Sequence, residues 1–122
     1  MPKLTLYHPK GAGVGNDHLS LIKVSLQRLA AEAATTEESP LTFEDVDFVP
    51  IAYDDASTQF SQPVAIEIET FGYPARKAKM TKEAMTAMKV PVRDILAPVG
   101  LRVELDKPLI WLKFQDPDGQ HV

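Results

Sequence analysis

Val64-Ala65-Ile66-Glu67-Ile68-Glu69 is the stretch of sequence that decides the fold, because apolar side chains alternate along it with acidic ones. A period of two is typical of a β-strand that has one face on the core. Gly72-Tyr73-Pro74 comes shortly afterwards, and its glycine and proline are typical of a turn. The sequence therefore predicts a strand here, followed by a turn.

A helix is predicted beyond this turn, over about Lys79–Leu96. Apolar residues recur there at helical spacing, and they keep their phase on both sides of Pro91. A proline inside a helix removes a backbone hydrogen bond and bends the helix. The preserved phase favours one helix kinked at Pro91 over the alternative, which is two short helices that meet at Val90.

Two more apolar segments follow this helix. Leu101, Val103 and Leu105 alternate with polar residues, which predicts another strand. Leu109–Phe114 is a further apolar segment. The strand that completes this half of the chain is therefore predicted to begin at Leu101.

The first half of the chain shows the same order of patterns. Lys3–His8 alternates and predicts a strand that has Pro2 and Leu4 on one face. An apolar stripe at helical spacing runs over residues 16–34. Phe43–Ile51 is predicted to be the second strand of this half.

The order strand, helix, strand therefore occurs twice, in pseudo-repeats of about 2–52 and 63–114 within a single domain of residues 1–122. Each half is a βαβ unit, which requires two parallel strands and a right-handed crossover. Two units predict an α/β fold in which a four-stranded sheet carries two helices on one face. The open face of such a sheet is usually covered by another subunit, so we expect an oligomer.

Composition excludes several classes of protein. The net charge of −4 argues against a nucleic-acid surface, which needs a concentrated basic stripe. The chain has no cysteine, which agrees with a cytoplasmic location. Neither a signal peptide nor a membrane span is indicated, because no apolar run suits either. The three histidines lack the spacing of metal ligands, so we expect no metal and no cofactor.

Pro2 directly follows Met1, and ordinary removal of the methionine would leave a proline at the amino terminus. The pKa of an α-amino group is about 7.7–8.0, already close to neutrality. Burial among apolar neighbours disfavours the charged form and lowers that pKa further. A free Pro2 would therefore be a general base near physiological pH, or an amine nucleophile. A harmless proline at the start of a strand is the alternative.

Together these patterns resemble the tautomerase superfamily, which includes 4-oxalocrotonate tautomerase and macrophage migration inhibitory factor. Pro2-Lys3-Leu4-Thr5-Leu6 is similar to the opening strand of that family. Residues 63–72 followed by Arg76 are similar to its repeat, although Tyr73-Pro74-Ala75 is inserted before the arginine. Residues 101–104 resemble the strand that carries a second arginine, Arg102. Residues 118–121 resemble the ending of a less characterised bacterial branch.

The resemblance implies a homotrimer in which Pro2 is general base and acid for a small enol or α-keto acid. It implies that Arg76 and Arg102 bind the substrate carboxylate and the developing enolate. Tyr53 or Trp111 would form the apolar wall that keeps Pro2 neutral. Arginine suits this task because its guanidinium binds a carboxylate through two parallel hydrogen bonds. The physiological substrate is not specified, and related enzymes use the same proline for hydration and decarboxylation.

Other interpretations stand beside these. Arg76 fits a solvated helix start equally well, Arg102 fits a sheet-face ion pair, and Trp111 fits the core. The glycine-rich segment Lys10–Asp17 precedes a helix, which is a place where anions bind, but its spacing completes no phosphate-binding motif. A non-catalytic trimeric assembly or a small-anion-binding module with the same fold is therefore the alternative function.

Overall fold

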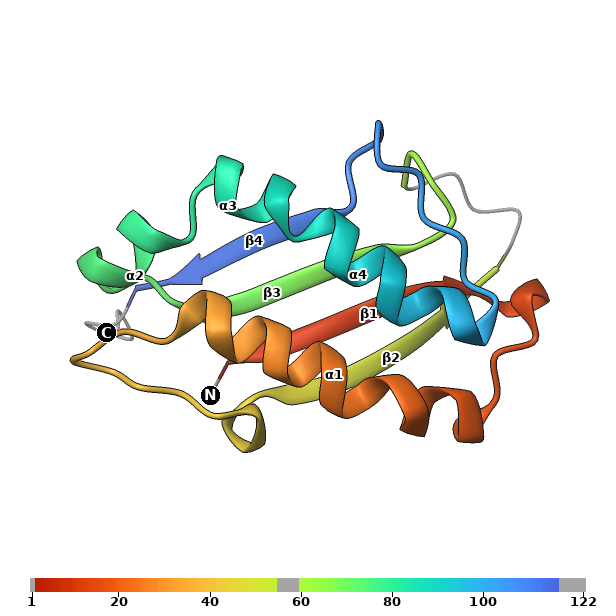
Figure 1. Cartoon of the computed structure of the whole chain (residues 1–122), viewed down its shortest axis with the longest axis horizontal. Helices are drawn as coiled ribbons and strands as arrows, with labels where there is room; N and C mark the ends of the chain where they lie inside the picture. Colours follow the sequence, from red (N-terminus) through yellow and green to blue (C-terminus); the bar gives the residue numbers. More distant parts are fainter. Residues whose placement is uncertain (1, 55–59, 117–122) are drawn as a thin grey trace.

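The computed structural model describes residues 2–54 and 60–116, and its centre is a four-stranded sheet (Figure 1). The strands are β1 (Lys3–Pro9), β2 (Asp47–Tyr53), β3 (Ala65–Phe71) and β4 (Ile110–Gln115), in the order β2-β1-β3-β4. The outer pairs, β1 with β2 and β3 with β4, are parallel, and the central pair is antiparallel. The predicted four-stranded sheet is confirmed.

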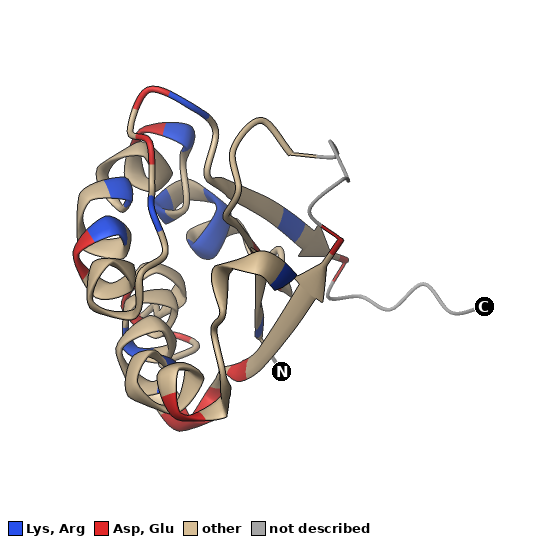
Figure 2. Ribbon diagram, turned by 90° about the vertical axis from the view of Figure 1, so that its right-hand side faces the viewer, with Lys and Arg blue, Asp and Glu red and all other residues tan. Residues whose placement is uncertain are grey.

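All the longer helices lie on one face of this sheet, as Figure 2 shows from the side. They are α1 (Asn16–Ala34), α2 (Pro74–Lys79), α3 (Lys82–Ala87) and α4 (Lys89–Leu96), with short 3₁₀ turns at Lys10–Ala12, Phe43–Asp45 and Ala97–Val99. Parallel strands need a crossover connection. Helix α1 makes the first crossover, and α2, α3 and α4 together make the second. Both predicted βαβ units are therefore present.

The core lies between the helices and the inner face of the two central strands. Leu4 and Leu6 of β1 are buried there, and so are Ile66 and Ile68 of β3. Leu26 of α1 belongs to the same cluster of buried side chains. Apolar and polar residues therefore alternate along these strands because one face of each strand packs against the helices.

Strand β2 begins at Asp47 and not at Phe43, where the sequence pattern placed its start. Phe43–Asp45 is a 3₁₀ turn. The Asp45 carboxylate accepts a hydrogen bond of 2.8 Å from the backbone N–H of Thr42. Because a side chain binds that N–H locally, the chain turns there before it enters the sheet.

The predicted kinked helix is wrong, since separate helices occupy this region and α2 already begins at Pro74. The hydroxyl of Thr81 accepts a hydrogen bond of 3.1 Å from Ala84 N–H and so begins α3. A break at Met88 separates α3 from α4. Pro91 lies in the first turn of α4, where a missing N–H costs no intrahelical bond. Two short helices were the alternative, and they meet at Met88 and not at Val90.

The strand predicted over Leu101–Leu105 is absent, and Leu109–Phe114 supplies β4 in its place. The side chain of Gln62 explains the difference. Its Oε1 accepts a hydrogen bond from Glu104 N–H at 2.9 Å, and its Nε2 donates to Glu104 O at 3.1 Å. The buried amide of Gln62 thus bonds to the backbone groups of Glu104 that a neighbouring strand would otherwise bond. The alternation at Leu101 and Val103 reflects burial in an extended segment outside the sheet.

Candidate functional site

Pro2 is buried at the end of the sheet where β1 begins. Its carbonyl oxygen accepts a hydrogen bond of 2.9 Å from Asp47 N–H of β2. Side chains alternate along a strand, so Pro2 shares the inner face with Leu4. Lys3 pairs with Glu69, and continuing this register by one residue places Thr70 of β3 across from Pro2. Thr70 is itself only 2% exposed.

Arg76, the third residue of α2, is tied to Thr70. Its Nη1 donates to Thr70 Oγ1 at 3.0 Å. Its Nε donates to Ala34 O at 2.7 Å, and its Nη2 donates to Ser39 Oγ at 2.9 Å. Longer contacts reach the carbonyl oxygens of Ser39 at 3.3 Å and Phe71 at 3.5 Å. The guanidinium therefore joins the end of α1, the segment after it and the end of β3.

The Arg76 side chain is almost completely buried, at 2% exposure, and all its hydrogen-bond acceptors are uncharged. Burial lowers the pKa of this guanidinium, and the nearby Tyr73 opposes that change. The Tyr73 ring lies 5.5 Å from the guanidinium carbon. Arginine stays charged in proteins, so Arg76 is a fixed positive charge in a dry environment.

A surface depression of about 200 Å³ lies beside this charge. Ser39 and Tyr73, which both contact Arg76, line it together with Thr36, Glu38 and Ala75. Pro2 is not among the residues that line it. The candidate site consists of Pro2, Thr70 and Arg76 at this end of the sheet, connected by the strand register and the Arg76–Thr70 hydrogen bond. Sequence reasoning missed Thr70 and Ser39, although the alternation of β3 already put Thr70 on the inner face.

Comparison with known proteins identifies the architecture. A fused 4-OT described as a wild-type asymmetric trimer is similar with a TM-score of 0.65 and 13% identity over 98% of this chain and 91% of that chain. Macrophage migration inhibitory factor of Toxoplasma gondii has a TM-score of 0.59 and 10% identity, over 94% of this chain and 90% of that chain. A malonate semialdehyde decarboxylase inhibited by 3-bromopropiolate has a TM-score of 0.53 and 16% identity, over 100% of this chain and 88% of that chain. The chain has the fold of the tautomerase superfamily. At these identities the likeness shows the fold alone.

No model of a protein family matches the chain, and no curated protein matches it either. The tautomerase fold is thus established by structure and not by sequence. The resemblance seen in residues 118–121 lies outside the described residues. Within the described part of the chain no helix is long and apolar enough to cross a membrane. In the same residues no three acidic or histidine side chains are grouped to hold a metal ion.

The other predicted site residues of this tautomerase-fold chain do not surround Pro2. Arg102 is exposed in the segment between α4 and β4. Tyr53 pairs with Pro9 at the far end of β1. Since a strand rises about 3.3 Å per residue, Tyr53 lies about 23 Å along the sheet from Pro2. Of the predicted site residues, which all lie in the described part of the chain, Arg76 alone is tied to the end of the sheet where Pro2 lies.

Tyr53 and Trp111 instead belong to an aromatic cluster on the face of the sheet opposite the helices. Phe60 connects it, with ring-centre distances of 4.9 Å to Tyr7, 6.0 Å to Tyr53 and 5.6 Å to Trp111. The Tyr53 hydroxyl donates a hydrogen bond to Pro63 O. Trp111 remains 37% exposed. The sequence did not indicate Phe60, which is the residue that joins the other three.

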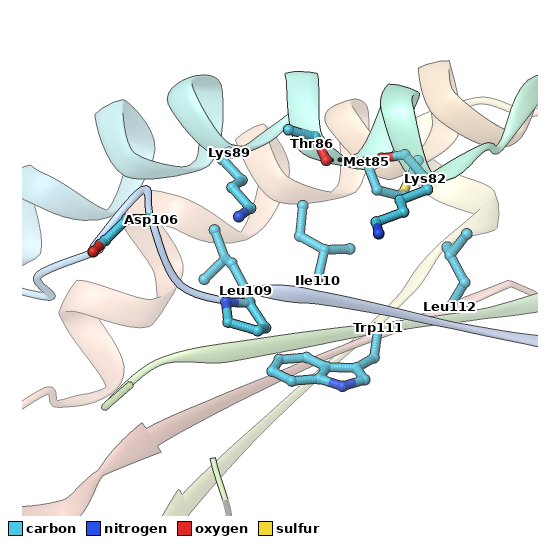
Figure 3. A pocket seen from close by; sticks show the side chains of 10 residues that line it. Lys82, Met85, Thr86, Lys89, Asp106, Leu109, Ile110, Trp111 and Leu112 are labelled. Atoms are coloured by element: carbon cyan, nitrogen blue, oxygen red, sulfur yellow. Dashed lines mark hydrogen bonds between the residues drawn. The ribbon is translucent and has the colours of Figure 1, made fainter. Parts of the chain in front are cut away.

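A larger cavity, of about 490 Å³, lies along the free edge of β4 (Figure 3). Lys82 and Lys89 extend toward it from the helices, while Trp111 points to the other side of the strand. Lys89 Nζ donates to Leu105 O at 3.2 Å and to Lys107 O at 2.9 Å. Strand β3 separates β4 from β1, and neither Pro2, Thr70 nor Arg76 lines the cavity. It is therefore separate from the Pro2 site.

Proposed function

We propose that the protein is a tautomerase that uses Pro2, freed by removal of Met1, on a small enol or α-keto acid. The proline amine takes the proton from the enol oxygen and returns a proton to carbon, so no cofactor is consumed. The observation that carries this proposal is the burial of Pro2 at the end of β1, beside the fixed charge of Arg76. A desolvated amine next to a cation is a neutral base at physiological pH.

The proposal includes a homotrimer, because Arg102, Tyr53 and Trp111 do not meet Pro2 within the described part of one chain. Some of the similar proteins are described as trimers. In the proposed trimer a neighbouring copy brings Arg102, Tyr53 and Trp111 to the proline. Arg102 is solvent-exposed and so has a side chain available to bind a carboxylate. Arg76 is not assigned to the substrate, because its N–H groups are already hydrogen-bonded.

The experiment that tests the mechanism compares Pro2→Ala with Pro40→Ala, a control at an exposed proline. Intact mass first establishes that Met1 is absent. Ketonisation of a set of enolised α-keto acids is then followed by the loss of enol absorbance. We expect Pro2→Ala to lower kcat/KM by about 100-fold or more, since general acid–base catalysis contributes 10²–10⁴-fold, and Pro40→Ala to leave it unchanged. Full activity of Pro2→Ala on every accepted enol would refute the mechanism.

A second experiment tests whether neighbouring copies share the site. Pro2→Ala and Arg102→Ala chains are each expected to be weakly active alone. Mixed trimers assembled from both chains should recover part of the activity, because some sites then combine an intact Pro2 with an intact Arg102. No recovery in mixed trimers would place Arg102 outside the site.

A non-catalytic assembly protein with the same fold is the second candidate function. It is favoured by the separation between Pro2 and the other predicted site residues within one chain. The mass of untagged protein from its native cells separates the two candidates. Retained Met1 would make the Pro2 nitrogen an amide and would leave assembly as the function.

A further inference from the structure

The cavity of about 490 Å³ along the free edge of β4 borders backbone groups that have no partner in the described part of the chain. Leu109 O accepts a hydrogen bond of 2.9 Å from Ile66 N–H, so Leu109 directs its backbone groups toward β3. These groups alternate from side to side along a strand. Ile110 and Leu112 therefore direct their N–H and C=O groups to the free edge, as edge strands do.

The side chains of the same two residues form part of an apolar wall. Ile110 and Leu112 are half-buried and point to the helix side of the sheet, while Trp111 between them points to the other side (Figure 3). Met85 of α3 is 5% exposed and lines the cavity from the helix layer. A mainly apolar cavity of this size with a few polar groups is typical of a site for a small organic molecule.

Lysine side chains make the cavity positive. Lys82 of α3 extends toward β4, and in the part of the chain that the structure describes its ammonium group makes no ion pair or hydrogen bond. Lys89 already donates to the carbonyl oxygens of Leu105 and Lys107. Asp106 is the acidic residue of the lining. Two lysines and one aspartate give one net positive charge, with the Lys82 ammonium available to a ligand.

We propose that this cavity binds a small organic carboxylate with an unbranched apolar chain. The carboxylate accepts hydrogen bonds from Lys82 Nζ and from a free N–H of the β4 edge. The apolar chain lies against Met85, Ile110 and Leu112. One carboxylate matches the one net positive charge of the lining, and charge-assisted hydrogen bonds are the strong ones. This site is separate from Pro2, so the inference goes beyond the proposed function and does not depend on it.

The length of the cavity favours a small molecule over an added peptide strand. The lining follows the chain from Pro108 to Leu112 and includes no later residue of β4. A strand rises about 3.3 Å per residue, so Leu109–Leu112 span about 10 Å, less than the usual five or six residues of a strand. At the other end, Lys89 is bonded to the loop before Pro108, and Pro108 has no N–H to offer a peptide.

Calorimetric titration of the protein in its native oligomeric state tests the proposal, with octanoate and decanoate as probes. Octanol has the apolar chain without the charge, and acetate has the charge without the chain. Each probe is titrated into wild type, Lys82→Gln, which removes the charge, and Lys82→Arg, which keeps it. Lys23→Gln, at an exposed lysine of α1, is the matched control.

We expect decanoate to bind about tenfold more tightly than octanoate, because two more methylene groups are buried. Lys82→Gln should weaken decanoate binding by about fivefold, the upper end for a partly exposed ion pair. Lys82→Arg and Lys23→Gln should bind decanoate as wild type does, and acetate should not bind. The proposal is overturned if decanoate does not bind, if Lys82→Gln binds it like wild type, or if octanol binds as tightly as octanoate.

Amide signals in NMR spectra locate the ligand. Decanoate should shift the N–H signals of Ile110 and Leu112 and leave that of Asp47, which bonds to Pro2 O in β2. A shift at Asp47 without one at Ile110 or Leu112 would place the ligand elsewhere and overturn the proposal. The peptide N-acetyl-Val-Leu-Val with a free carboxylate is the probe for strand addition. Tighter binding of this peptide than of decanoate would make the edge a peptide site instead.

Binding at this cavity and the proposed activity can fail separately. Pro2→Ala should bind decanoate as wild type does, and loss of binding in that variant would assign the ligand to the Pro2 site and overturn the proposal. Full enol activity of Pro2→Ala would refute the proposed mechanism and leave the cavity unaffected.

Discussion

Arg76 donates a hydrogen bond from Nη1 to the hydroxyl of Thr70 at 3.0 Å, which connects α2 to the end of β3. The same guanidinium reaches the last residue of α1 through Ala34 O. Arg76 therefore helps to join the two βαβ units at one end of the sheet, as does Lys79 of α2, which donates to Glu32 O and Thr35 O. Because the Arg76 side chain is buried, each acceptor around it matters to the stability of the fold.

Thr70→Val tests the contribution of that hydroxyl. Valine has nearly the same shape but cannot accept a hydrogen bond, so a buried N–H of Arg76 loses its partner. We expect the free energy of unfolding in urea to fall by about 1–3 kcal/mol. Thr86→Val is the matched control, because the Thr86 hydroxyl bonds to Lys82 O on the exposed surface. An equal effect of the two substitutions would contradict this account.

The architecture was predictable from sequence because its signals are local. The alternation over Ala65–Phe71 and the long apolar stripe of α1 both come from one face packed on the core. The strand predicted from Leu101 failed because the same alternation arises in an extended segment that is held by Gln62. Gln62 is 42 residues from Glu104, so no local pattern reveals the contact.

Gln62→Leu tests this explanation. It removes a buried amide that bonds to both backbone groups of Glu104 and also donates to Pro108 O at 2.9 Å. We expect a loss of at least about 2 kcal/mol in unfolding free energy, because buried polar groups lose their partners. Hydrogen exchange at Glu104 N–H should accelerate more than at Ile66 N–H, which bonds to Leu109 O. Equal acceleration at both amides would indicate only a global loss of stability.

The candidate site was only partly predictable. Pro2 could be proposed because its position after Met1 is visible in the sequence, and its catalytic role stays a prediction. The neutral surroundings of Arg76 could not be predicted, since its partners Ala34 and Ser39 are 42 and 37 residues away. Whether Arg102, Tyr53 and Trp111 bind a substrate stays a prediction, because they do not meet Pro2 within one chain.

Glu69→Gln should change how stability depends on pH. Burial raises the pKa of Glu69, but a hydrogen bond with Gln115 and the charges of Lys3 and Lys113 outweigh it, so the net shift is downward from 4.5. A lowered pKa in the folded state stabilises the protein above 4.5, and that contribution is lost as pH falls through the folded value. The lysines are 3.6 and 3.5 Å from the carboxylate and are largely exposed. The stabilisation is therefore at most about 1 kcal/mol.

The measurement is the difference in unfolding free energy between wild type and Glu69→Gln at several pH values. We expect the variant to be less stable at pH 7 and the difference to vanish in acid. Glu67→Gln is the control on the same face of β3, since no ion pair of Glu67 occurs in the described part of the chain. A difference that does not vary with pH would be inconsistent with a charge effect.

Trp111→Arg tests whether the face of the sheet opposite the helices is a subunit interface. Trp111 is 37% and Ile51 is 39% exposed on that face. Large exposed apolar groups on one sheet face favour burial by another copy. An arginine at position 111 would place an unpaired charge in the proposed interface, so we expect the mass in solution to fall from that of the proposed trimer to that of a monomer. Sedimentation equilibrium at several concentrations measures it.

Leu21→Arg is the control for this experiment. Leu21 is 73% exposed on α1, so it lies on the helical side and its substitution should leave the trimer intact. If Trp111→Arg keeps the wild-type mass, the proposed interface on the open face of the sheet is wrong. The same holds if Leu21→Arg alone dissociates the protein, which would indicate an interface on the helical side. Trp111→Arg should also lower enol ketonisation, because dissociation separates the two copies that form the proposed site and because Trp111 itself belongs to that site.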